Sequence, residues 1–212
     1  EEIVFNADNW QLEQTIVVTG VDDYLKDGDQ VYKLKVTTVS EDADFNELVA
    51  ESVELTNIDK TTPGIVVSET ALTTYEDQAQ EAASFSIVLT SIPSADVNLT
   101  LSSSNPNEGV ATPTTLKFTK DNWNEPHVVT VKGVDDNAHD GNKNYTIFFS
   151  PSESNDEDYN EKQLTPIKVT NVDNDVAGLS VNLPEAFVLL EGQTMPLLVR
   201  LNTLPKKDVK IT

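Results

Sequence analysis

The chain repeats itself at an interval of about 113 residues, and this repeat limits its fold more than any other feature. The segment Phe5-Asn-Ala-Asp-Asn-Trp10 returns as Phe118-Thr-Lys-Asp-Asn-Trp123, and Leu55-Thr-Asn-Ile-Asp59 returns as Val169-Thr-Asn-Val-Asp173. A period of this length is longer than a solenoid turn and suits an independent β-sandwich.

Alignment of the copies divides the chain into one whole repeat and two partial ones. Residues 64–175 form the complete copy, residues 1–60 match only its later part, and residues 178–212 match only the beginning of the next. We expect each partial copy to leave a core face and strand edges open. Two explanations remain: a longer tandem array has been trimmed, or the end of one chain completes the start of another, head to tail, into a filament.

Hydrophobic and polar residues alternate through the complete copy, as in strands that face a core on one side. The side chains expected on the core side are Phe85, Ile87, Leu89, Val97, Leu99, Leu101, Leu116, Phe118, Val129, Val131, Tyr145, Ile147, Phe149, Ile167 and Val169. The first copy keeps this phase with Ile16, Val18, Tyr32, Leu34, Val36, Val53 and Leu55. No segment has a helical period, so the sequence predicts an all-β fold of tandem antiparallel β-sandwich repeats, immunoglobulin-like, with about seven strands each.

The charge balance excludes several classes of function. The 36 acidic and 14 basic side chains give a net charge of −22, which excludes non-specific binding to nucleic acid because such binding needs a basic face.

The absence of certain residue types and segments excludes further classes of site. There is no cysteine, so disulfides and thiolate metal sites are excluded. No hydrophobic run approaches the roughly 18 residues of a membrane span. No signal peptide is visible at Glu1-Glu2, and we expect an excerpt from a longer protein.

An acidic loop occupies the same place in both copies, from Gly133 to Tyr145 and from Gly20 to Tyr32. Each has a glycine, paired aspartates, a later Asp-Gly and a tyrosine at matching positions. Carboxylates this close repel one another unless they are solvated or neutralised, and a hard cation with oxygen ligands is the usual neutraliser. The spacing is not that of an EF-hand. The alternative interpretation is that these aspartates only form Asx-type turns.

The motifs together resemble a Calx-β repeat. They include Leu116-Lys-Phe, Val134-Asp-Asp, Tyr145-Thr-Ile and the closing Val169-Thr-Asn-Val-Asp-Asn-Asp175. The stretch Asp121-Asn-Trp-Asn-Glu-Pro126 is similar to tandem copies in long bacterial surface and secreted proteins. The resemblance implies a β-sandwich, and some members of this family bind Ca²⁺ at one tip.

Matched residue by residue, the resemblance implies a set of calcium ligands in each copy. In the complete copy these are Glu76, Asp135, Asp136, Asp140, Asp173 and Asp175. In the first copy Asp22, Asp23, Asp27 and Asp59 are kept, but Lys60 and Thr61 replace the last two positions, so we expect that site to be weaker or empty. Glu191 stands where Glu76 does. The expected affinity is that of extracellular modules, a Kd of about 10⁻⁴–10⁻³ M.

No catalytic framework accompanies these sites. There is no Ser-His-Asp set or glycine-rich phosphate loop, and His127 and His139 are interpreted as single surface residues, so we expect no enzyme. The sequence indicates a structural segment, a stalk, spacer or fibre, of a bacterial cell-surface or secreted protein. Its expected partners are neighbouring repeats and further copies of itself, with calcium stiffening the junction Asn171–Gly178. The alternative is an adhesin-type module for a glycan or protein, which an exposed aromatic patch on one copy alone would favour.

Overall fold

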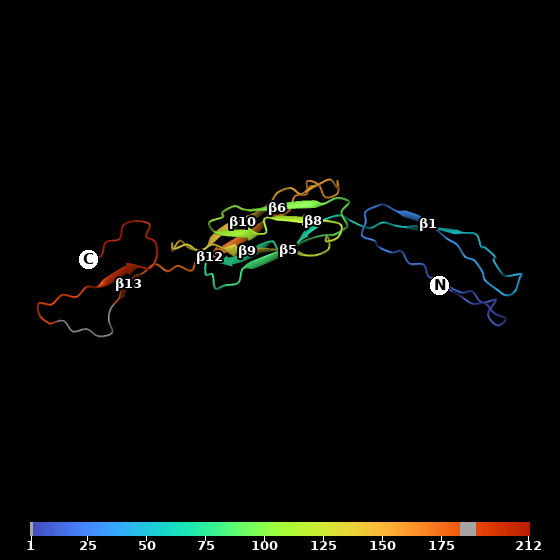
Figure 1. Ribbon diagram of the computed structural model, residues 1–212, viewed down its shortest axis with the longest axis horizontal. Helices are drawn as coiled ribbons and strands as arrows, with labels where there is room; N and C mark the ends of the chain where they lie inside the picture. Colours follow the sequence, from blue (N-terminus) through green and yellow to red (C-terminus); the bar gives the residue numbers. More distant parts are fainter. Residues whose placement is uncertain (1, 183–189) are drawn as a thin grey trace. The chain divides into compact units, whose positions relative to one another are not determined.

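The computed structural model describes residues 2–182 and 190–212, and none of them lies in a helix (Figure 1). The chain divides into two compact units, residues 1–62 and 63–212. The prediction of an all-β fold is confirmed for the described residues. Since these residues contain no helix, none of them supplies a membrane-spanning one.

Residues 65–172 form a sandwich of two sheets, and several of its strands are labelled in Figure 1. The first sheet has the order β3 (Ile65–Val67), β5 (Ala83–Leu89), β9 (His127–Gly133), β7 (Gly109–Thr112). The second has the order β11 (Glu153–Ser154), β6 (Val97–Ser103), β10 (Lys143–Phe149), β12 (Ile167–Val172), β4 (Ala71–Tyr75), and β8 (Thr115–Phe118) also pairs with β6. The pairs are antiparallel except for β12 with β4, which run parallel.

The core lies between these sheets and contains every side chain of the complete copy that the alternation places there. Successive residues of a strand point to opposite faces, so one residue in two is buried. Phe85 of β5 meets Phe149 of β10 edge to face, with ring centroids 6.1 Å apart, and joins the two sheets. Trp123 packs against the same core from the loop after β8.

The complete copy has ten strands, more than the number read from the sequence, because several are short. β3 and β4 divide one stretch between the two sheets, since β3 pairs with β5 and β4 pairs with β12. β7 and β8 do the same on either side of Pro113, and β11 has only two residues. The alternation of hydrophobic and polar residues does not reveal where a short stretch passes from one sheet to the other.

The first unit contains β1 (Gln30–Leu34) paired with β2 (Val53–Asn57). Tyr32 lies opposite Leu55, just as Tyr145 of β10 lies opposite Val169 of β12. The pairing of this unit therefore repeats the register of the complete copy.

The segment after the complete copy contains β13 (Leu179–Asn182) paired with β14 (Leu198–Leu201). Leu179 lies opposite Leu201, just as Ile65 of β3 lies opposite Leu89 of β5. Both partial copies thus keep the local pairings of the whole one.

Candidate metal site at the sandwich tip

Strands β4 and β12 end side by side, and this brings their following residues together. Tyr75 pairs with Val172 in the parallel register, and the N–H of Glu76 donates to the carbonyl of Val172 at 3.1 Å. Asp173 follows directly after Val172. Because parallel strands finish at the same edge of a sheet, acidic residues placed just after two such strands become neighbours.

Three carboxylates meet at this edge. Glu76, Asp173 and Asp175 each place one carboxylate oxygen so that the three oxygens lie within 4.8 Å of one another. Glu76 is 2% exposed, and the side chain of Asp173 is 5% exposed. Like charges this close and this poorly hydrated repel one another, so the cluster is an electrostatic cost that a bound cation would offset.

The pKa values show that the carboxylates are not equally placed. Burial raises the pKa of Glu76, and the charges of Asp173 and Asp136 act in the same direction. Burial also raises the pKa of Asp175, and the charges of Asp173, Asp135 and Asp136 add to this. Two acids of the cluster are therefore ionised at a cost, and this pattern is typical of a site that favours positive charge.

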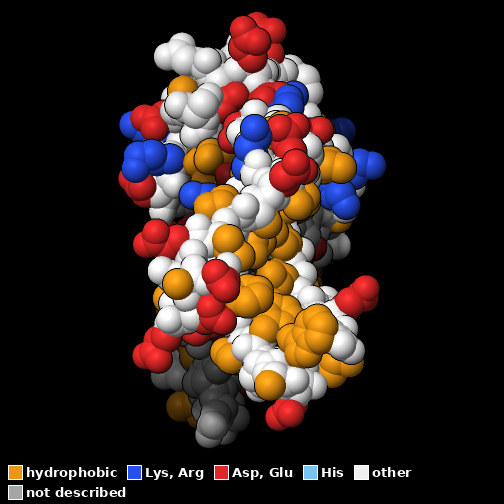
Figure 2. All heavy atoms as spheres, turned by 90° about the vertical axis from the view of Figure 1, so that its right-hand side faces the viewer, with side chains coloured by type: hydrophobic (Ala, Val, Ile, Leu, Met, Phe, Trp, Pro, Cys, Tyr) orange, Lys and Arg blue, Asp and Glu red, His pale blue; other side chains and the backbone are white. Residues whose placement is uncertain are grey.

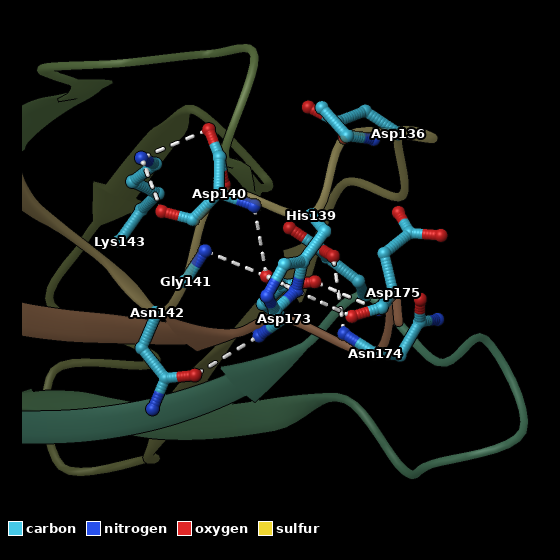
Figure 3. Close-up of polar contacts among 11 residues, drawn as sticks. Asp136, His139, Asp140, Gly141, Asn142, Lys143, Asp173, Asn174 and Asp175 are labelled. Carbon is cyan, nitrogen blue, oxygen red and sulfur yellow. Dashed lines mark hydrogen bonds and ion pairs between the residues drawn. The ribbon is translucent and has the colours of Figure 1, made fainter. Parts of the chain in front are cut away.

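Asp173 has the opposite environment because the tip loop wraps around its carboxylate (Figure 3). Its Oδ1 accepts from the N–H of Asp175 at 2.7 Å, and its Oδ2 accepts from the N–H groups of Gly141 at 2.6 Å and Asp140 at 3.1 Å. The N–H of Asp175, then that of Gly141, are the main causes that lower the pKa of Asp173. Gly141 has a φ of 78°, which favours glycine, so the loop can turn here and aim its amides inward.

Asp175 supplies an oxygen that the protein does not use. Its Oδ2 is buried and has no hydrogen-bond partner among the described residues. Buried carboxylate oxygens are normally hydrogen-bonded or bound to a metal, since desolvation is otherwise uncompensated. This oxygen is the clearest indication of a ligand at the tip.

The other predicted ligands lie around this cluster in different roles. Asp135 accepts from the side-chain amide of Asn174 at 3.4 Å. Asp136 accepts from the N–H of Ala138 at 2.6 Å, which is an Asx-type turn. Asp140 forms an ion pair with Lys143 at 2.8 Å, and Figure 3 shows the two side chains meeting away from Asp175. The structure thus joins three of the predicted acids directly and leaves three as neighbours.

Two residues at the tip were not predicted to belong to the site. His139, interpreted as a surface residue, places Nδ1 at 2.7 Å from the carbonyl oxygen of Asp175 and 3.5 Å from Oδ2 of Asp173. Glu108 is close enough for its charge to raise the pKa of Glu76. Glu108 lies in a stretch with no counterpart in either partial copy, so comparison of the copies could not reveal it.

A buried polar network supports the tip from below. Asn171, 0% exposed, accepts from the hydroxyl of Thr74 at 3.0 Å and donates to the carbonyl of Val134 at 3.3 Å. A side chain at Gly133 would overlap Oδ1 of Asn171 and the carbonyl oxygen of Tyr75, so glycine is required for this close approach. The paired aspartates leave the sheet immediately after this packed point.

The first unit contains the equivalent acidic loop, residues 20–32, but its described residues lack the cluster of three carboxylates. Asp59 accepts from Gly28 at 2.9 Å and from Thr61 at 2.7 Å, as Asp173 does from its own neighbours. The N–H of Thr61, then that of Gly28, lower the pKa of Asp59. Asp22 and Asp23 each accept a backbone N–H two residues ahead. No described residues of this unit form a group of three acids like that of Glu76, and binding at Asp27 and its neighbours stays a prediction.

No family model matches the sequence, and no curated protein matches it. Among solved structures, the chain is similar to the apo-form Calx CBD1 domain, with a TM-score of 0.39, 14% identity, and coverage of 52% of this chain and 98% of that one. It is also similar to the periplasmic chaperone SfaE, with a TM-score of 0.41, 9% identity and coverage of 52% of this chain. A third similar structure is that of domains 4 and 5 of the S-layer protein SbsC, with a TM-score of 0.36, 14% identity and coverage of 73% of this chain. The match spans 58% of the SfaE chain. The resemblance to Calx-β repeats stays a prediction.

Proposed function

We propose that the chain is a non-catalytic structural segment, a stalk or spacer of a bacterial cell-surface or secreted multi-repeat protein, whose inter-repeat junction is stiffened by Ca²⁺. The observation that carries this proposal is the carboxylate cluster of Glu76, Asp173 and Asp175 with the unused buried oxygen of Asp175. Carboxylates from separate segments are the ligands that Ca²⁺ takes. Asp135 and Asp136 would complete the negative environment of the ion.

The position of the cluster makes it a junction site. Asp173 and Asp175 belong to the stretch that leads from β12 to β13, whereas Glu76 belongs to the body of the sandwich. An ion bound by both would hold the start of the linker against the sandwich. The tip loop also reaches the following segment, since the N–H of Leu204 donates to the carbonyl of Asn137 at 2.7 Å. Ordering of the tip loop would therefore restrict the segment that follows.

An adhesin is a weaker proposal for this chain. It would need an aromatic patch built for a ligand, and the first unit does expose Phe5, Tyr32 and Phe45. Their counterparts in the complete copy, however, are the core residues Phe118, Tyr145 and Tyr159. The exposure of these rings therefore reflects a core face that the partial copy leaves open, not a surface built for a ligand.

Calorimetric titration with Ca²⁺ and Mg²⁺ tests the metal site. We expect saturable binding of Ca²⁺ by the wild-type chain and at least a tenfold loss of affinity in Glu76→Gln and Asp175→Asn. Asp121→Asn is the matched control, because that carboxylate is exposed, forms an ion pair with Lys120 beside it and is not one of the predicted ligands. Equal affinity for the two metals, or unchanged affinity in the cluster variants, would contradict the proposed site.

Spin labelling tests the stiffening separately. The chain has no cysteine, so Val176→Cys gives one label in the exposed linker after Asp175, and Val128→Cys gives a control label on strand β9. We expect Ca²⁺ to broaden the spectrum of the linker label and to leave that of the strand label unchanged. A linker label with the same mobility in calcium and in chelator would refute the mechanical role, even if calcium binds.

A further inference from the structure

The acidic segments at the tip come from both sheets of the sandwich. Glu76 follows β4 and Asp173 follows β12, both in the second sheet, whereas Asp135 and Asp136 follow β9 in the first. The parallel pairing of β4 with β12 places the acids of the second sheet. Among the described residues no strand pairing joins β9 to either of these strands. Other contacts must therefore hold the acids of the two sheets in register.

Charge alone does not distinguish this tip from the rest of the surface. Figure 2 shows acidic side chains spread over one face of the molecule, in keeping with the net charge of −22. A metal site differs from such a surface because hydrogen bonds from neighbouring groups hold its ligands in fixed positions. The hydrogen bonds that fix the backbone of the tip segments are therefore part of the site.

Two side-chain amides hold the residues that lead to Asp135. Asn171 of β12 donates to the carbonyl of Val134 at 3.3 Å. Gln78, in the loop after β4, donates to the carbonyl of Gly133 at 3.3 Å. Two consecutive carbonyls at the end of β9 are thus bound by amides from the second sheet and the loop that follows it.

Gln78 differs from Asn171 because it also binds the segment that carries Glu76. Its Nε2 donates to the carbonyl of Glu76 at 2.9 Å as well as to that of Gly133. A side-chain NH₂ group has two hydrogens, so one amide serves both carbonyls. The N–H of Glu76 already donates to the carbonyl of Val172 at 3.1 Å. The backbone of Glu76 is therefore fixed on both sides, by β12 and by Gln78.

The partial copies keep the parts of this arrangement that they contain. In the first copy Asn57 stands where Asn171 does and donates to the carbonyl of Val21 at 3.0 Å. In the segment after the complete copy, Glu191 stands where Glu76 does, and Gln193 follows it at the spacing of Gln78. The glutamate and the glutamine thus occur together in both copies of this stretch.

We propose that Gln78 is a positioning residue of the metal site at the tip. Its one amide fixes the backbone of Glu76 relative to the segment that leads to Asp135 and Asp136, so that carboxylates from both sheets face the same ion. Without this donor each ligand is still present, but the acids of the two sheets are free to separate. This inference rests on the proposed function.

Terbium luminescence tests the effect of Gln78 on binding. Tb³⁺ takes oxygen ligands as Ca²⁺ does, and its higher charge strengthens binding, so a weakened site stays measurable. Gln78→Met keeps the length of the side chain but removes the donor, and we expect it to weaken Tb³⁺ binding roughly tenfold. Gln80→Met is the matched control, because Gln80 is exposed in the same loop and donates to Asp77, which is not a predicted ligand.

Europium luminescence lifetimes in H₂O and D₂O add a readout that a loss of stability does not change, because they report the water on the bound ion. We expect Eu³⁺ to hold more water in Gln78→Met than in the wild-type chain, since a displaced carboxylate leaves a coordination position to solvent. In a Glu76→Gln background, Gln78→Met should have little further effect, because both changes act on the same ligand. Unchanged affinity, unchanged hydration, equal changes in Gln80→Met, or additive losses would each overturn the inference.

Hydrogen exchange in chelator separates this inference from the proposed function. The N–H of Val134 donates to the carbonyl of Glu108 at 3.0 Å, next to the carbonyl of Gly133 that Gln78 holds. We expect this N–H to exchange faster in Gln78→Met and at the wild-type rate in Gln80→Met. A wild-type chain that binds no Ca²⁺ would contradict the proposed function and, with it, the metal role of Gln78. A chain that binds Ca²⁺ but shows unchanged exchange in Gln78→Met would overturn this inference alone.

Discussion

Gly133→Ala tests whether the packed point below the tip positions the metal site. The added Cβ would overlap Oδ1 of Asn171 and the carbonyl oxygen of Tyr75, and would lie 2.8 Å from the carbonyl carbon of Tyr75. Backbone atoms of a paired strand cannot move aside as easily as the end of a flexible side chain. The end of β4 and the next residue, Glu76, must therefore shift. Overpacking of this kind costs about 1–3 kcal/mol. For a domain of this size that corresponds to a decrease in Tm of roughly 4–20 °C.

Tryptophan fluorescence provides the assay. Trp123 packs against the core of the complete copy, whereas Trp10 is 64% exposed in the first unit, so a Trp10→Phe background leaves one probe of the sandwich. Gly64→Ala is the matched control, because its Cβ would meet only the side chain of Thr90, at 3.2 Å. We expect Gly133→Ala to lower Tm and weaken calcium binding, and Gly64→Ala to change neither strongly. Equal melting of both variants and the parent would refute the reasoning.

Three further predictions follow from single contacts at the core and the tip. Tyr159→Phe removes the hydroxyl that accepts from the buried N–H of Ser91, so it should lower the free energy of unfolding by about 1–3 kcal/mol in a denaturant titration. Tyr75→Phe, at an exposed position, should change this free energy little. Lys143→Gln removes a positive charge from the edge of the cluster, so calorimetry should show tighter binding of Ca²⁺; weaker binding would contradict this. Because the pKa values of Glu76 and Asp175 are raised above their ordinary values of 4.5 and 3.8, Tm in chelator should rise as pH falls from neutral through the folded-state pKa values. The rise of Tm on adding Ca²⁺ should shrink over the same range, since protons compete with the metal; a constant rise would count against these ligands.

At still lower pH the trend in chelator should reverse. The pKa of Asp173 is lowered below its ordinary value of 3.8 by backbone N–H groups, so its contribution to stability is present above that value and is lost as pH falls through the folded-state pKa. Tm in chelator should therefore pass through a maximum at acidic pH. A Tm that falls steadily from neutral pH would contradict the raised pKa values of the other two acids.

The core of the complete copy could be predicted from the sequence because strand alternation is local information. Every side chain assigned to that core by alternation is buried there. Tyr159 and Ala111 were missed, since Tyr159 lies in a turn and is buried because its hydroxyl contacts Ser91, and Ala111 lies in a short edge strand. Contacts between residues this far apart leave no periodic signal.

The sequence predicted which acidic residues form the candidate site, but not how their side chains are arranged. The repeated aspartates indicated where carboxylates gather, and Glu76, Asp173 and Asp175 do lie together. The sequence did not show that Lys143 engages Asp140 or that His139 lies against the linker, because both depend on how the loop folds back. Single residues without a repeated counterpart could not be distinguished from ordinary surface residues.

Thermal unfolding in EDTA, in Ca²⁺ and in Mg²⁺, followed through Trp123, tests the central claim most directly. With a Kd of about 10⁻⁴–10⁻³ M, about 10 mM Ca²⁺ should stabilise the complete copy by roughly 1.4–2.7 kcal/mol. We predict a rise in Tm of about 5–15 °C that is specific to calcium and is largely lost in Asp175→Asn. No rise, an equal rise in Mg²⁺, or a full rise in that variant would contradict a calcium site at the tip.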